Sequence, residues 1–189
     1  MPINISRKRW LLPVVAIFAL AIAKPAAAIP VLGGQLFYTG GNVTIDVLAK
    51  SAAYDSELRL YDSSLALQFA NIALASQTGL SVMFAPSSYG FNVGDELVFG
   101  IRVINTGNIF FMGPAGRNPD GVAHAEVDTL SSTSFFVGFE DLYGGGDFDY
   151  NDMRFNMSGA LAVAIPEPNA LALLVLGLLG LMVGKRRNP

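Results

Sequence analysis

In FFVGFEDLYGGGDFDYNDMRFNM, residues 135–157, an acidic, glycine-rich segment separates two apolar runs. The runs 135–139 and 153–157 predict two β-strands, because each is rich in aromatic and apolar side chains and borders turn-forming residues. Between them lie five carboxylates, three consecutive glycines and no basic residue. The segment therefore predicts two strands joined by a loop with organised polar chemistry.

The same alternation of short apolar runs and turn-forming residues extends back to residue 33. Residues 43–47 and 58–61 alternate polar and apolar side chains with period two, as half-buried antiparallel strands require. The segment 105–108, Asn-Thr-Gly-Asn, predicts a tight hairpin turn, whereas 65–76 fits either a strand or an amphipathic helix. The expected strands are 35–38, 43–48, 58–61, 65–73, 80–84, 97–105, 109–112, 123–128, 135–139 and 153–157, with 160–165 as a last strand or the start of a tether. We expect an all-β fold, an antiparallel two-layer β-sandwich of jelly-roll or immunoglobulin-like type.

The N-terminus has the features of an export signal. A basic patch at residues 7–9 precedes an apolar run over 10–23 and then three alanines that end at Ala28. This order predicts a secretory signal peptide over 1–28 with cleavage after Ala28. The alternative is an N-terminal membrane anchor, for which the apolar run is shorter than the ~20 residues a spanning helix prefers.

The C-terminus carries Pro166, Glu167 and Pro168, an apolar run over 170–184, and a basic end that includes Arg186 and Arg187. As a helix the apolar run covers about 22 Å, against a hydrocarbon core of ~30 Å, and so predicts a short transmembrane helix. These features in this order resemble the PEP-CTERM sorting signal of Gram-negative bacteria, over 165–189. The resemblance implies processing by an exosortase and release to the cell surface or an extracellular polysaccharide matrix. The alternative is a permanent tail anchor.

Between the two ends, residues 29–164 make up the expected β-sandwich domain. Residues 29–165 contain fourteen acidic and five basic side chains, a formal charge of −9. Such a balance suits cations and argues against nucleic acid and anionic lipid as partners of this domain. The chain has no cysteine, so an exported domain of this size has no disulfides and bound metal could supply the cross-links.

Carboxylates crowded between 140 and 152 repel one another unless a cation lies among them, and oxygen ligands without cysteine favour Ca²⁺. Asp147, Asp149 and Asn151 have the spacing that opens an EF-hand, but Asp152 stands where that motif needs glycine and Ser158 where it needs glutamate. We therefore expect a calcium loop between strands, the alternative being a solvated inter-strand loop. The expected ligands are Glu140, Asp141, Asp147, Asp149, Asn151, Asp152 and, from a Pro-Asp-Gly turn, Asp120.

Residues 138–155 also resemble the DUF4114 family, with Gly-Phe-Glu-Asp-Leu, then Gly-Gly-Asp-Phe-Asp-Tyr-Asn-Asp and a hydrophobic strand. The segment 118–121, Asn-Pro-Asp-Gly, followed by His124, is similar to the family's upstream part, so the resemblance covers about 97–157. It implies a β-sandwich of extracellular bacterial proteins, often considered calcium-binding, with no established enzymatic activity. His124, the only histidine, is expected to be a hydrogen-bonded structural residue.

These features predict a non-enzymatic calcium-binding protein of the cell surface or matrix, exported by signal peptidase and exosortase-type machinery. Its expected partners are an extracellular polysaccharide and, through the C-terminal helix, the membrane. An alternative is a Ca²⁺-dependent carbohydrate-binding module in which Tyr143, Phe148 or Tyr150 stacks on sugar. A weaker third reading is a glycoside hydrolase that uses Glu140 with Asp152 or Asp149.

Overall fold

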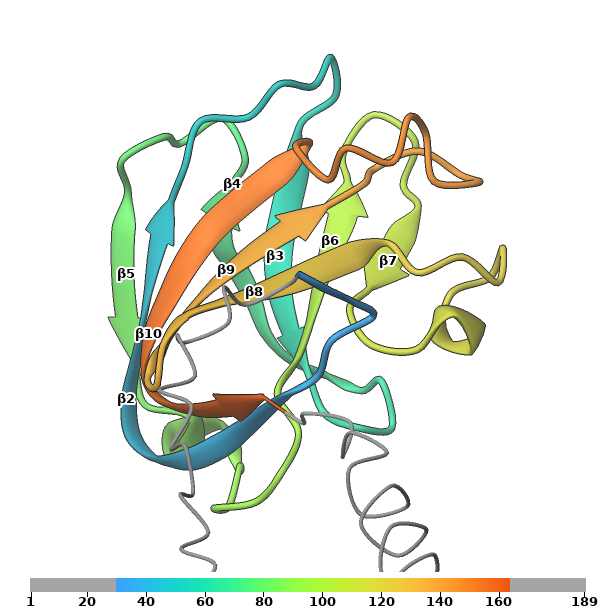
Figure 1. Cartoon of the computed structure of the whole chain (residues 1–189). Helices are drawn as coiled ribbons and strands as arrows, with labels where there is room; N and C mark the ends of the chain where they lie inside the picture. Colours follow the sequence, from blue (N-terminus) through green and yellow to red (C-terminus); the bar gives the residue numbers. More distant parts are fainter. Residues whose placement is uncertain (1–29, 164–189) are drawn as a thin grey trace, which may run out of the picture.

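The computed structural model describes residues 30–163, which form two antiparallel β-sheets (Figure 1). The first sheet has the strand order β1-β8-β9-β10-β2-β5, and the second has the order β4-β3-β6-β7. The strands are β1 (Val31–Leu32), β2 (Leu36–Val47), β3 (Ser56–Tyr61), β4 (Leu67–Leu74), β5 (Ser81–Phe84), β6 (Val98–Val103), β7 (Ile109–Phe111), β8 (Ala125–Ser131), β9 (Ser134–Phe139) and β10 (Met153–Val163). Two short 3₁₀ helices, η1 (Pro86–Tyr89) and η2 (Ala115–Arg117), are the only helical segments in this part of the chain.

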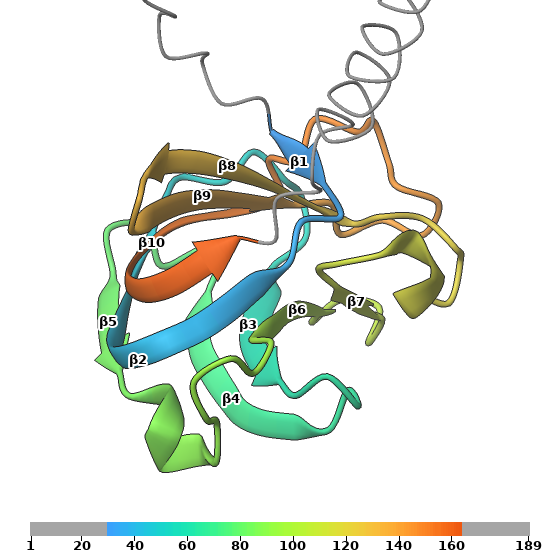
Figure 2. The same ribbon diagram turned by 60° about the horizontal axis from the view of Figure 1, so that its bottom comes forward.

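The two sheets face each other across one apolar core, which confirms the all-β prediction (Figure 2). In β2 the side chains of Val43, Ile45 and Val47 are buried, as their period-two pattern predicts. The ring of Phe155 on β10 lies 6.1 Å, centroid to centroid, from the ring of Phe99 on β6 in the opposite sheet. Contacts of this kind join the sheets into a two-layer sandwich.

Two expected strands, 35–38 and 43–48, form one continuous strand, β2. Gly40 and Gly41 adopt φ of +106° and +81°, a conformation that glycine reaches without steric cost. The pairing with β10 shifts register at the same place, between Gly159 and Leu161. The glycines therefore bend the strand at a bulge and do not end it, which the turn-forming residue types alone did not predict.

The other strand predictions agree with the structure within a few residues. The ambiguous segment 65–76 contains strand β4, because it pairs with β3 along an edge of the second sheet and has no helical turn. The predicted hairpin at 105–108 joins β6 to β7, with Gly107 at φ +78°. The strand β1 was not predicted, because two residues are too short for a periodic pattern to be recognised.

The last strand, β10, continues through Val163, so the segment 160–163 is a strand rather than a tether. Within residues 30–163 no helix has the length and apolar character needed to cross a membrane. The predicted signal peptide over 1–28 and the predicted helix over 170–184 lie outside the described residues.

Candidate metal centre

The glycine loop, residues 140–152, joins the end of β9 to the start of β10 at one end of the sandwich (Figure 1). Its two ends are fixed together, because Phe139 pairs with Met153 and the Asp152 N–H donates to the Phe139 carbonyl (3.1 Å). Positive φ angles occur along the loop at Gly144, Gly145, Gly146, Phe148 and Tyr150. A left-handed backbone costs an L-residue roughly 1–2 kcal/mol, so specific contacts must hold the two aromatic residues in this conformation.

Three carboxylates of the loop converge. Glu140, Asp147 and Asp149 each offer an oxygen within 4.8 Å of the others. Glu140 is only 1 % exposed, whereas Asp147 and Asp149 are solvent-exposed. The group therefore has one buried carboxylate at its base and two at the surface.

The buried carboxylate of Glu140 is half satisfied. Its Oε1 accepts a hydrogen bond from the Tyr150 N–H (2.5 Å), but its buried Oε2 has no hydrogen-bond partner among residues 30–163. Burial raises the pKa of Glu140 to about 7, and the charges of Asp152, Asp147 and Asp149 add to this despite the opposing Tyr150 hydrogen bond. An unpartnered buried carboxylate oxygen is costly, so Glu140 Oε2 is a candidate cation ligand.

Gly146 makes room for that oxygen. A Cβ atom placed on Gly146 would lie 2.6 Å from Glu140 Oε2, closer than real Cβ contacts allow. Its φ of +56° also favours glycine. The glycine at this position thus serves both the turn and the close approach of the carboxylate.

Asp141 and Asp152 form a second pair beside the first group. Asp152 Oδ2 accepts a hydrogen bond from the Asp141 N–H (2.9 Å), and Ser56 Oγ donates to Asp141 Oδ2 (3.4 Å). Burial, with Asp141 only 2 % exposed, and the charge of Asp152 raise the pKa of Asp141 to about 6. With Glu140, Asp147 and residues 51–54, these carboxylates line a cavity of about 360 Å³.

Asn151 positions one of the two exposed carboxylates. Its backbone N–H donates to Asp149 Oδ1 (3.1 Å), and its side-chain amide donates to Asp149 Oδ2. The Asn151 Oδ1 is buried and has no partner in the described part of the chain. Asn151 therefore holds Asp149 in place and keeps an acceptor oxygen of its own free.

Asp120 fastens the glycine loop from outside the three-carboxylate group. Its Oδ2 forms a hydrogen bond with His124 Nε2 (2.8 Å) and accepts one from the Gly144 N–H (2.8 Å), and its Oδ1 accepts one from the Val122 N–H (3.1 Å). Burial alone would raise the pKa of Asp120, but these three hydrogen bonds outweigh it and lower the pKa to about 2. Both carboxylate oxygens are thus already occupied.

His124 completes this fastening. Its Nδ1 donates to the Glu140 carbonyl (2.9 Å), and its ring stacks on Phe110 with the centroids 3.8 Å apart. Together, Asp120 and His124 hold the loop at Glu140 and at Gly144. The sequence predicts Asp120 as a ligand and does not reveal this role, for which the i, i+4 spacing of the two residues is the only local signal.

The comparisons with known proteins agree with both resemblances. The model of a domain of unknown function, DUF4114, matches residues 91–160, and that of the PEP-CTERM protein-sorting motif matches residues 164–187. The first match includes β6 to β9, most of β10, the glycine loop and the Asp120–His124 pair. No curated protein and no solved structure matches the chain.

The sorting motif indicates processing by exosortase-type machinery and export across the inner membrane to the cell envelope or surface of a Gram-negative bacterium. Strands β2 to β5 precede the DUF4114 match, yet β2 and β5 pair in the sheet that contains β9 and β10. The chain is therefore a PEP-CTERM sorting-motif protein that carries a DUF4114 domain.

Proposed function

We propose that this exported protein is a non-enzymatic calcium-binding protein of the cell surface or extracellular matrix, and that Glu140, Asp147 and Asp149 hold the ion. The observation that carries the proposal is the buried, unpartnered Oε2 of Glu140 beside two exposed carboxylates. A cation among them would remove the mutual repulsion and supply the partner that this oxygen lacks.

The donor set favours Ca²⁺ over a transition metal. Every candidate ligand offers oxygen, the chain has no cysteine, and its one histidine is engaged with Asp120 and the Glu140 carbonyl. Ca²⁺ accepts six to eight oxygens in irregular arrangements. The free Oδ1 of Asn151 and water are available to complete such a shell.

The proposed role is structural. Carboxylates of Glu140, Asp149 and Asp152 each accept a hydrogen bond from a backbone N–H of the glycine loop. An ion at this place would hold the loop closed between β9 and β10, and would strengthen a cysteine-free domain after export.

Thermal unfolding of the purified protein, with chelator and with millimolar Ca²⁺, tests this proposal. The expected result is a melting temperature that rises with Ca²⁺ concentration, as ligand binding to the folded state requires. The matched control is Asp46→Asn, which removes one exposed charge of β2 and should leave the calcium effect intact. An unchanged melting temperature at millimolar Ca²⁺ would refute the proposal.

A second candidate is Ca²⁺-dependent carbohydrate binding at the glycine loop, and the exposure of two aromatic rings favours it. Tyr143 is 65 % and Phe148 is 53 % exposed, and both belong to the glycine loop. Tyr150 is only 8 % exposed and donates its hydroxyl hydrogen to the Ala123 carbonyl (3.3 Å), so it offers no free stacking face. This candidate predicts glycan binding that chelator and Tyr143→Ala both abolish.

A further inference from the structure

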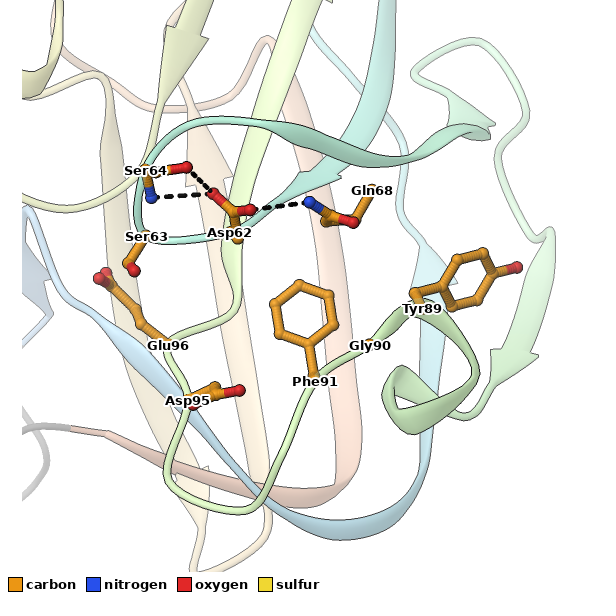
Figure 3. Close-up of a pocket in the computed structure, with 9 residues that line it drawn as sticks. All are labelled: Asp62, Ser63, Ser64, Gln68, Tyr89, Gly90, Phe91, Asp95 and Glu96. Atoms are coloured by element: carbon orange, nitrogen blue, oxygen red, sulfur yellow. Dashed lines mark hydrogen bonds between the residues drawn. The ribbon is translucent and has the colours of Figure 1, made fainter.

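A second cavity, of about 370 Å³, lies away from the glycine loop (Figure 3). Strand β3 separates the two places: Ser56 at its start contacts Asp141 of the glycine loop, and Asp62, just after its end, lines the second cavity. At about 3.3 Å per residue, the two places are roughly 20 Å apart. The volume of the second cavity falls within the 300–1,000 Å³ typical of small-molecule sites.

Aromatic rings form one wall of this cavity. Figure 3 shows the ring of Phe91 between the polar groups of Asp62 and Gln68 on one side and Asp95 on the other. Phe91 is only 5 % exposed and belongs to the core, so its ring is held firmly. Tyr89, which also lines the cavity, stacks on Phe69 with the ring centroids 4.5 Å apart. Phe91 therefore offers a rigid apolar contact in a cavity whose other lining residues are mostly polar.

The rim consists of hydrogen-bond acceptors that internal hydrogen bonds hold in place, and two of them have an oxygen without a donor. Asp62 accepts hydrogen bonds from the Ser64 N–H (2.8 Å), the Ser64 hydroxyl (2.6 Å) and Gln68 Nε2 (2.8 Å). Asp95 Oδ2 accepts one from the Asn92 N–H (2.7 Å). Among residues 30–163, Asp95 Oδ1 and Gln68 Oε1 have no hydrogen-bond donor. Asp95 and Gln68 thus each keep an oxygen free for a ligand, whereas both oxygens of Asp62 already accept hydrogen bonds.

The charge of the cavity limits what it can bind. Glu96 also lines it, but both of its carboxylate oxygens contact the Arg117 guanidinium (3.0 Å each). That pair is neutral overall, which leaves the negative charges of Asp62 and Asp95. Hydroxyl and ammonium donors are attracted to such a rim, whereas a carboxylate or phosphate is repelled.

We propose that this cavity binds a neutral or amino-sugar residue of a polysaccharide and rejects uronic acids. The apolar face of a sugar ring fits against an aromatic wall, and its hydroxyl or ammonium hydrogens fit acceptor oxygens that are already oriented. Binding here involves no residue of the glycine loop. Sugar binding at this cavity therefore does not depend on calcium, and its test is independent of the test of the proposed function.

The test is titration calorimetry of the purified protein, in chelator, with three tetrasaccharides: one of glucose, one of glucosamine and one of a uronic acid. We expect saturable binding of the first or second and none of the third. Asp95→Asn replaces an acceptor by a donor, and Ser63→Trp fills the opening at an exposed position. Asp95→Asn should weaken binding about 10- to 100-fold, as loss of a charged hydrogen bond does, and Ser63→Trp should weaken binding because its ring obstructs the opening. Asp46→Asn is the control and should bind as the wild type does.

Thermal melting of each variant first establishes that the variant is folded. If one of the two substitutions prevents folding, the other still tests the proposal. No binding of either permitted sugar, or tighter binding of the uronic acid, overturns the proposal. So does binding that requires Ca²⁺ and is lost in Tyr143→Ala but not in Asp95→Asn, because the sugar would then lie at the glycine loop.

Discussion

Replacing Glu140 by glutamine should have opposite effects with and without calcium. The substitution keeps the size of the side chain and the acceptor for the Tyr150 N–H, and removes the buried negative charge. Without metal, that charge destabilises the fold, because burial and neighbouring carboxylates raise the pKa of Glu140 from 4.5 to about 7. Keeping the group ionised in the folded protein therefore costs about 3 kcal/mol.

The sign of the effect depends on pH. The stability associated with a raised pKa is fully present below the unfolded value, near 4.5, and is lost as pH rises through about 7. In chelator at pH 8, Glu140→Gln should therefore melt roughly 5–10 °C above the wild type for a domain of this size. At pH 5 most of this difference should disappear, because Glu140 is then protonated in the folded wild type.

With Ca²⁺ the order should reverse. Ligand at 1,000 times its dissociation constant stabilises a folded protein by about 4.1 kcal/mol, which exceeds the roughly 3 kcal/mol cost of the buried charge, and the variant lacks the buried charged ligand that we assign to the ion. Differential scanning calorimetry at pH 8, with chelator and with millimolar Ca²⁺, measures both effects, and Asp46→Asn controls for a simple change of net charge. The reasoning is wrong if the variant melts below the wild type in chelator, or if Ca²⁺ stabilises both proteins equally.

Three further predictions concern the same loop. The melting temperature of the metal-free wild type should fall between pH 5 and pH 8, because the pKa values of the buried carboxyls of Glu140 and Asp141 are raised to about 7 and about 6. The rise in melting temperature on adding Ca²⁺ should grow over the same range, and a pH-independent calcium effect would contradict this. Asp120→Asn should lower the free energy of unfolding by about 2–3 kcal/mol in urea titrations, and this difference from the wild type should disappear as pH falls from about 4 to about 2. The variant should also bind calcium more weakly, and unchanged stability at pH 7 would argue that Asp120 does not fasten the loop. Gly146→Ala should weaken calcium binding in calorimetry, because the added Cβ would meet Glu140 Oε2. Gly107 also has a positive φ but faces open space, so Gly107→Ala should lower stability alone, and equal calcium affinity in both variants would refute the explanation.

The strands were predictable because their physical cause is local. Side chains such as Val43, Ile45 and Val47 alternate with polar neighbours, and this pattern places one face of the strand in the core. The hairpin around Gly107 was equally clear from its residue types. The continuity of β2 through Gly40 and Gly41 was not, because glycines that form a bulge and glycines that end a strand look alike in sequence.

The site was predictable in place but not in arrangement. The crowding of acids between residues 140 and 152 located it, yet did not separate Glu140, which joins Asp147 and Asp149, from Asp141, which pairs with Asp152. Successive residues of an extended chain point to opposite sides, and the backbone reversals of the glycine loop then decide which acids meet. The hydrogen bond from Gly144 to Asp120 spans 24 residues and no local pattern reveals it.

The most direct test of the central claim is a crystal structure of the protein grown with millimolar Ca²⁺, with anomalous diffraction data collected at long wavelength. We predict an anomalous peak between Glu140, Asp147 and Asp149, at calcium–oxygen distances of about 2.3–2.6 Å that include Glu140 Oε2. A glycine loop that is well ordered in such crystals, with no peak at these three carboxylates, would contradict the account.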